Sequence, residues 1–144
     1  MEKSQTLFRR ADEIKDIEHV ITVRASIVDA FEALTVPAIM DEWGGGPARV
    51  QARPNGRYSL WDGDVVGTVK EVEYPRLIVH SFREISWDDA YLDSIVTWTL
   101  EETERGTRIT LQHTGLPTRR LREIHDEMWA ESFLGPLKVH LEGS

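Results

Sequence analysis

The feature that most constrains the fold is a long apolar stripe near the end of the chain, between Thr118 and Leu141. Its apolar residues recur at helical spacing, which predicts one long helix with a continuous apolar face. Because the preceding segments alternate as strands do, this helix has only one large apolar surface to cover, and we expect it to lie across a curved sheet. Such an arrangement encloses space, and what fills that space decides the function. The stripe consists of Leu121, Ile124, Met128, Trp129, Phe133, Leu137 and Leu141.

The composition excludes several classes of protein. A chain of 144 residues is long enough for one domain that buries its core without disulfides, and it contains no cysteine. Its formal charge of −8 opposes binding to nucleic acid or to an anionic membrane surface. The sequence has no apolar run of the roughly 20 residues that a membrane-spanning helix needs. We therefore expect a cytoplasmic globular protein without a nucleic-acid or membrane partner.

The chain divides into an arm and a domain. Residues 1–16 are polar and are predicted to form an N-terminal arm, and residues 17–144 a single domain. The domain begins with an alternating strand at residues 17–24, followed by two short helices, the first capped by Ser26 and the second started by Pro37. Beyond these helices, turn signals recur about every ten residues, as in a meandering antiparallel sheet. The further predicted strands are residues 49–52, 57–61, 65–72, 77–83, 94–101 and 107–113.

These segments predict an α+β fold: a curved seven-stranded antiparallel sheet wrapped around a long C-terminal helix, with two short helices after the first strand. Thr118 is the predicted N-cap of the last helix. We expect a kink at Gly135-Pro136, because proline cannot donate its backbone hydrogen bond and its ring crowds the preceding turn.

Several separated pieces of sequence carry a family resemblance: residues 28–35 with Trp43, then 56–58, 67–72, 75–79, 106–111 and 129–138. Together with the order of elements, they resemble the helix-grip fold of the START and SRPBCC superfamily, in the bacterial branch that is similar to the C-terminal domain of the heat-shock-protein-90 ATPase activator. The resemblance covers roughly residues 17 to 141 and implies a cavity between sheet and helix. Relatives bind lipids, sterols, plant hormones or polyketides there, some catalyse cyclisation or dehydration, and others assist a chaperone.

Strand alternation predicts which side chains face the helix. The faces that carry Tyr58, Trp98 and His113 are apolar with sparse polar groups, as in a pocket for a mainly hydrophobic ligand. In this hypothesis Tyr58 and His113 are the polar anchors, and the other residues shape the pocket. The alternative is that the same large side chains fill a closed core. The predicted ligand-binding residues are Trp43, Tyr58, Trp98, His113, Met128, Trp129 and Phe133.

The histidines do not have the spacing of metal ligands. His80 and His113 lie in predicted strands, where either could reach the cavity and exchange a proton. We expect His125 and His140, on the last helix, to be solvated. The sequence predicts no metal site, no cofactor and no catalytic residue.

Three features mark possible entrances or contact surfaces. Asp41 precedes Trp43 at the expected cavity mouth, where a carboxylate beside an indole could exchange a proton. Trp87 and Tyr91 lie in an acidic loop, residues 86–93, which is expected to be flexible and could gate a ligand or contact a second subunit. Trp61 is expected to face outward, opposite Tyr58.

The leading hypothesis is a non-catalytic or weakly catalytic domain that binds a small hydrophobic or amphipathic molecule between sheet and C-terminal helix. The first alternative is a protein-interaction module that acts as a chaperone cofactor, with a chaperone or a second copy of the chain as partner. The second alternative is an enzyme of the cyclase or dehydratase type, which would need His113 or Asp41 inside the cavity.

Overall fold

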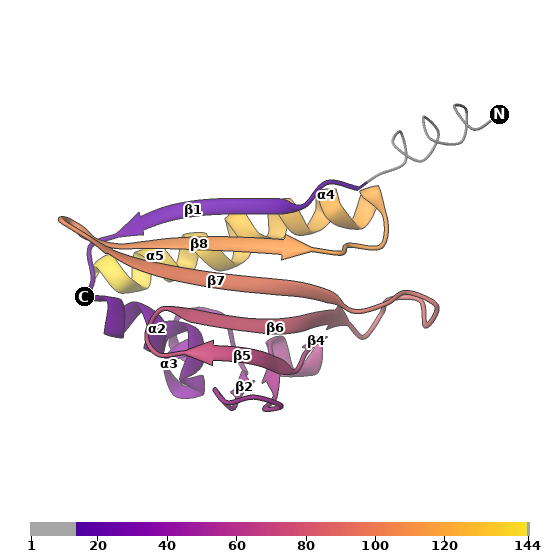
Figure 1. The fold of residues 1–144 in the computed structure, drawn as a ribbon, viewed down its shortest axis with the longest axis horizontal. Coiled ribbons are helices and arrows are strands. Elements are labelled where there is room, and N and C mark those ends of the chain that lie inside the picture. The colour runs from indigo at the N-terminus through magenta and orange to yellow at the C-terminus, as the bar shows by residue number, and fades with distance from the viewer. Residues whose placement is uncertain (1–13, 144) are drawn as a thin grey trace.

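The computed structural model describes residues 14–143, and a curled antiparallel sheet with a long helix along it dominates this part of the chain (Figure 1). This arrangement confirms the α+β helix-grip fold. The predicted arm lies outside the described residues apart from residues 14–16, of which Ile14 packs against the core. The strands are β1 (Ile17–Val23), β2 (Arg49–Val50), β3 (Tyr58–Ser59), β4 (Val65–Val66), β5 (Val69–Glu73), β6 (Leu77–Glu84), β7 (Ser94–Thr103) and β8 (Gly106–Thr114). The helices are α2 (Ile27–Thr35), α3 (Pro37–Trp43), the 3-10 turn η1 (Trp61–Gly63), α4 (Arg119–Met128), the π-helix η2 (Trp129–Leu134) and α5 (Gly135–Gly143).

The main sheet has the strand order β1-β8-β7-β6-β4, and β5 also pairs with β6; β2 and β3 form a separate pair. The predicted strand at residues 65–72 is divided at Gly67 and Thr68 into β4 and β5. At this point the backbone approaches β6 so closely that a Cβ on Gly67 would lie 1.9 Å from the carbonyl oxygen of Ser81. A continuous strand with a side chain at this position cannot fit, so the described residues contain eight strands where the sequence predicts seven.

The two short helices begin as predicted. Ser26 Oγ accepts a hydrogen bond from the backbone N–H of Asp29 at 3.0 Å and caps α2. Pro37 starts α3, and Gly44 ends it with a φ of 115°, a conformation that favours glycine.

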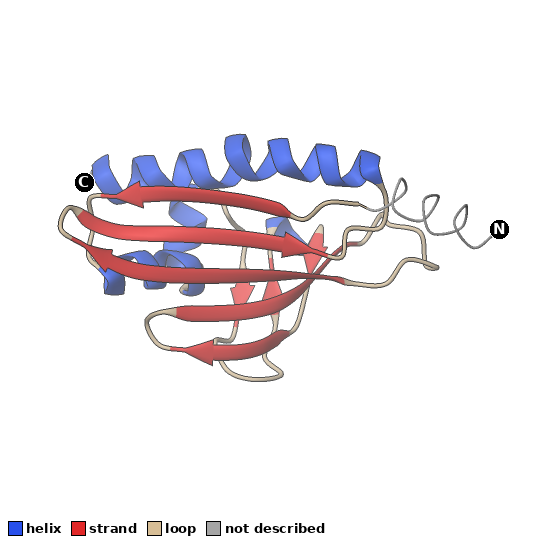
Figure 2. Ribbon diagram, turned by 45° about the horizontal axis from the view of Figure 1, so that its top comes forward, coloured by secondary structure: helices blue, strands red, loops and turns tan. Residues whose placement is uncertain are grey.

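The C-terminal helix is continuous over α4, η2 and α5, which follow one another as one rod along the sheet (Figure 2). Thr118 caps its start, because its side chain accepts from the N–H of Leu121 at 3.0 Å. In place of the kink predicted at Gly135-Pro136, the helix contains the π-helical segment η2 immediately before these residues. There the N–H of Gly135 donates to the carbonyl oxygen of Ala130, five residues back. The wider turn accommodates the missing N–H of Pro136 without a break in the rod.

The helix also covers the free edge of β1. Lys138 Nζ donates to the carbonyl oxygen of Thr22 at 2.5 Å, and the N–H of Arg24 donates to Glu142 at 2.9 Å. Side chains of the helix thus pair with backbone groups at this edge, which has no neighbouring strand to satisfy them. Within the described residues, no helix combines the length and the apolar character needed to cross a membrane.

Candidate functional site

Six of the seven predicted ligand-binding residues lie together between the sheet and the C-terminal helix, where they form what we call the aromatic cluster. All six are buried, and the rings other than Tyr58 contact one another. The Trp98 and Trp129 ring centroids, for example, are 5.6 Å apart at an interplanar angle of 83°. Trp43 and Phe133 meet edge to face at 4.8 Å. These contacts fill the space under the helix with side chains. The cluster consists of Trp43, Tyr58, Trp98, His113, Trp129 and Phe133.

Both ring nitrogens of His113 are engaged inside the cluster. Trp129 Nε1 donates to Nδ1 at 2.9 Å, so the ring proton is on Nε2, which lies 2.8 Å from Ser94 Oγ. Ser94 in turn donates to the carbonyl oxygen of Phe82 at 2.9 Å. Burial, with a smaller effect of the nearby His125 and His80, lowers the pKa of His113 from 6.5 to about 3. The imidazole is therefore neutral at physiological pH.

His80 is held in a similar way. Its Nδ1 donates to the carbonyl oxygen of Ser81 at 2.8 Å, and its Nε2 accepts from Trp98 Nε1 at 3.3 Å. Burial lowers the pKa of His80 to about 4. Its ring stacks on Tyr58 with centroids 3.8 Å apart. Both strand histidines thus serve as hydrogen-bond acceptors for buried indoles.

Tyr58 donates its hydroxyl to the carbonyl oxygen of Leu34 at 2.7 Å, and burial raises its pKa. The two predicted polar anchors, Tyr58 and His113, therefore both make their hydrogen bonds to other residues of the protein. Asp41 lies outside the cluster: it is exposed, and its Oδ1 accepts from the N–H of Ala48 at 3.0 Å. Neither His113 nor Asp41 offers an unengaged proton-transfer group to a substrate under the helix.

An open cavity lies beside the cluster, between the C-terminal helix and the strands β4 and β6. We call it the helix-strand groove; its volume is about 540 Å³. Met128, the seventh predicted residue, is half-buried on its wall. The groove thus combines apolar side chains with carboxylates and hydroxyls. It is lined by Trp61, Asp64, Val65, Glu84, Ile85, Ser86, Met128 and Ser132.

Trp61 faces the groove, contrary to the outward orientation expected from strand alternation. The chain leaves the strand at η1, where Trp61 has a φ of 49° and Asp62 one of 57°. Trp61 Nε1 donates to the carbonyl oxygen of Gly44 at 2.9 Å, and its ring meets Phe133 edge to face at 6.2 Å. Trp61 therefore joins the groove to the aromatic cluster.

The prediction that His125 is solvated is wrong: this residue is buried against the sheet. Its Nδ1 lies 2.6 Å from the carbonyl oxygen of Leu121, and its Nε2 lies 2.7 Å from Glu84 Oε2. Both ring nitrogens of His125 therefore lie within hydrogen-bond distance of oxygen atoms. The hydrogen bond from His125 lowers the pKa of Glu84. His125 is four residues from both Leu121 and Trp129, and this helical spacing was the signal for its inward position.

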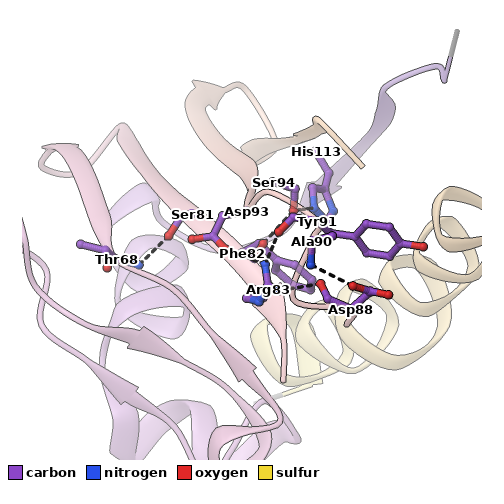
Figure 3. Close-up of polar contacts among 10 residues, drawn as sticks. All are labelled: Thr68, Ser81, Phe82, Arg83, Asp88, Ala90, Tyr91, Asp93, Ser94 and His113. Atoms are coloured by element: carbon purple, nitrogen blue, oxygen red, sulfur yellow. Dashed lines mark hydrogen bonds and ion pairs between the residues drawn. The ribbon is translucent and has the colours of Figure 1, made fainter. Parts of the chain in front are cut away.

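The loop at residues 86–93 is held by Arg83 (Figure 3). The guanidinium donates to the carbonyl oxygens of Asp88 and Tyr91, both at 2.8 Å, and pairs with Asp93 at 3.2 Å. Trp87 does not project from the loop as a gate but is buried against Phe82 and His125. Its Nε1 has no hydrogen-bond partner among the described residues. The loop therefore closes the end of the aromatic core.

The fold and sequence are similar to those of known proteins. Residues 24–142 match the family described as Activator of Hsp90 ATPase homolog 1-like protein. The fold is similar to that of an HSP90 activator from Plasmodium falciparum, with a TM-score of 0.77, 23% identity and coverage of 86% of this chain and 94% of that chain. It is also similar to the Aha1 dimer from Colwellia psychrerythraea, with a TM-score of 0.76, 19% identity and coverage of 90% and 97%.

An uncharacterized protein of Schizosaccharomyces pombe is 28% identical over 124 residues. The match covers 86% of this chain but only 36% of that protein, so the chain spans a minor part of this relative. The family match, in contrast, extends from the residue after the first strand almost to the end of the C-terminal helix. The chain therefore belongs to the family of Activator of Hsp90 ATPase homolog 1-like proteins.

Proposed function

We propose that this domain binds a small amphipathic molecule in the helix-strand groove. The observation that carries the proposal is the groove itself. Its volume of about 540 Å³ lies within the range of small-molecule sites, and its wall combines apolar surface with a few polar groups. A ligand in this position would contact the helix and the curled end of the sheet together, as the helix-grip arrangement allows.

In this proposal the aromatic cluster is the floor of the site and Met128 is part of its wall. Phe133 contacts Trp61, which lines the groove, and Trp98 and Trp129 pack behind Phe133. The predicted binding residues thus support the ligand from below, whereas direct contacts come from residues at the groove surface.

A groove-filling substitution tests the proposal. Ser132 is exposed and lines the groove, so Ser132→Phe should fill it without disturbing the core. Ala130 is exposed on the same π-helix but does not line the groove, so Ala130→Phe is the matched control. Fatty acids, sterols, aromatic polyketides and alkylamines are screened by thermal shift and titration calorimetry. We expect at least one class to bind the wild type and Ala130→Phe but not Ser132→Phe. A screen without any binder, or binding that survives Ser132→Phe, would contradict the proposal.

A second candidate function is that of a chaperone cofactor. The observation that favours it is membership of the Activator of Hsp90 ATPase homolog 1-like family. Measuring the ATPase rate of an Hsp90-type chaperone with and without this protein tests it. Stimulation by both the wild type and Ser132→Phe would indicate a surface function that is independent of the groove, and a rate unchanged by the wild type would remove this candidate.

A further inference from the structure

The helix-strand groove is acidic as well as apolar. Asp64 and Glu84 are the two charged residues among its lining side chains, which include no lysine or arginine. The two acids are neighbours across paired strands, because Val65 lies opposite Glu84 and the N–H of Ile85 donates to the carbonyl oxygen of Asp64 at 3.0 Å. Both acidic residues therefore lie on the same part of the groove wall, where β4 pairs with the end of β6.

Nearby cations do not neutralise this surface. Arg83 precedes Glu84 but belongs to the loop at residues 86–93, where its guanidinium is engaged. On the buried side of Glu84, His125 Nε2 lies 2.7 Å from Oε2 and engages that one carboxylate oxygen. The Asp64 carboxylate is not neutralised, because no hydrogen bond or ion pair engages it among the described residues.

The carboxylates also keep free acceptor sites. Glu84 Oε2 accepts from His125, whereas Oε1 has only the hydroxyl of Ser86, at 3.4 Å. A carboxylate offers about four acceptor positions, so both acids depend on water for the rest of their hydrogen bonds. A neutral apolar ligand that covered them would remove this water without replacing its hydrogen bonds, which disfavours binding.

The apolar wall offers a complementary feature. The Trp61 ring is held in place by its hydrogen bond to Gly44, and it shares the groove with Met128 and Val65. An indole face attracts a cation electrostatically, and the thioether and aliphatic side chains accept an alkyl or aryl body.

Resting on the proposed function, we propose that the ligand class of this groove is an amphipathic cation, such as a primary alkyl- or arylammonium compound. The ammonium group donates to Asp64 and to the free oxygen of Glu84, and the apolar body lies on Trp61 and Met128. An anionic ligand of the same size is repelled, and a neutral one leaves the carboxylates without partners.

Three probes with the same chain and different head groups test the ligand class: octylammonium, 1-octanol and octanoate, titrated calorimetrically near neutral pH. We expect octylammonium to bind about tenfold more tightly than 1-octanol, and octanoate not to bind. Asp64→Asn should weaken octylammonium binding about fivefold and leave 1-octanol unchanged. The matched control is Glu102→Gln, which removes an exposed carboxylate on β7 outside the groove and should change neither affinity.

Equal affinities for octylammonium and 1-octanol, or an unchanged octylammonium affinity in Asp64→Asn, would overturn the cation preference while the groove remains a binding site. Failure of all three probes to bind would also overturn it. The proposed function itself is decided separately, by the wider screen with Ser132→Phe.

Discussion

The aromatic cluster and the helix-strand groove adjoin the same helix but differ in how their polar atoms are paired. In the cluster, the indole N–H groups of Trp43, Trp98 and Trp129 all donate to acceptors inside the protein. In the groove, Asp64 and the outer oxygen of Glu84 keep acceptor sites for another molecule. Buried polar groups that satisfy one another stabilise a single packing, whereas accessible unpaired groups can recognise a ligand. The difference is consistent with a structural role for the cluster and supports the proposed ligand-binding role of the groove.

The largest expected effect is on the cluster. Trp129→Ala removes a buried ring beside Trp98 and leaves Nδ1 of His113 without its donor. It should lower the free energy of unfolding by about 4 kcal/mol, measured by urea denaturation. Met128→Ala, the neighbouring residue on the groove wall, should cost only about 1 kcal/mol because its side chain is half-exposed. Equal losses in the two variants would contradict the distinction between the regions.

The second-largest expected effect is a loss of folding stability at acidic pH, which arises in the cluster. His113 has a pKa of about 3 in the folded protein against an ordinary value of 6.5, so between these values the unfolded chain binds more protons. Stability is fully present above pH 6.5 and falls toward lower pH, and His113 accounts for a loss of about 3 kcal/mol at about pH 4.5. His80, with a pKa of about 4, acts in the same direction.

Urea midpoints measured from about pH 7.5 to about pH 4.5 check this dependence. His113→Gln keeps an acceptor near Trp129 Nε1 but has no titrating ring, so its midpoint should fall less steeply than that of the wild type. The same slope in both proteins would mean that His113 does not carry the acid sensitivity.

The smallest expected effects on stability are those of substituting the two acidic residues of the groove, Glu84 and Asp64. Glu84→Gln removes the charged acceptor of the buried His125 and should lower the free energy of unfolding by about 2 kcal/mol. Asp64→Asn should change it by less than about 0.5 kcal/mol, since the Asp64 side chain has no partner among the described residues. Urea denaturation near neutral pH measures both. A large loss in Asp64→Asn would show that this carboxylate serves the fold and is not reserved for a ligand.

Much of the fold could be predicted because its signals are local. The alternation of Val96, Trp98 and Leu100 indicates the inward face of β7, and these side chains are buried as expected. The caps at Ser26 and Thr118 also depend on residues only three positions apart. The division between β4 and β5 could not be predicted, since it results from the approach of Gly67 to the backbone of β6.

Local sequence patterns predicted the candidate site only in part. Burial of the aromatic residues follows from their spacing, but the groove depends on Trp61, which a turn with positive φ rotates away from the orientation that strand alternation predicts. Glu84 and His125 meet across 41 residues of sequence, a contact that no local pattern contains. The groove therefore was not predicted, although Met128 on its wall was.

By itself, the sequence determined the α+β class, the caps of the helices and most of the side chains that face the helix, because periodicity and capping act over a few residues. The resemblance to a known family added the helix-grip arrangement. Only the tertiary structure decided that the large aromatic residues satisfy one another in a filled cluster and that the open cavity lies beside them. The physical reason is that hydrogen-bond pairing and cavity shape depend on how the sheet curls around the helix, and this curl brings together residues that are far apart in the chain.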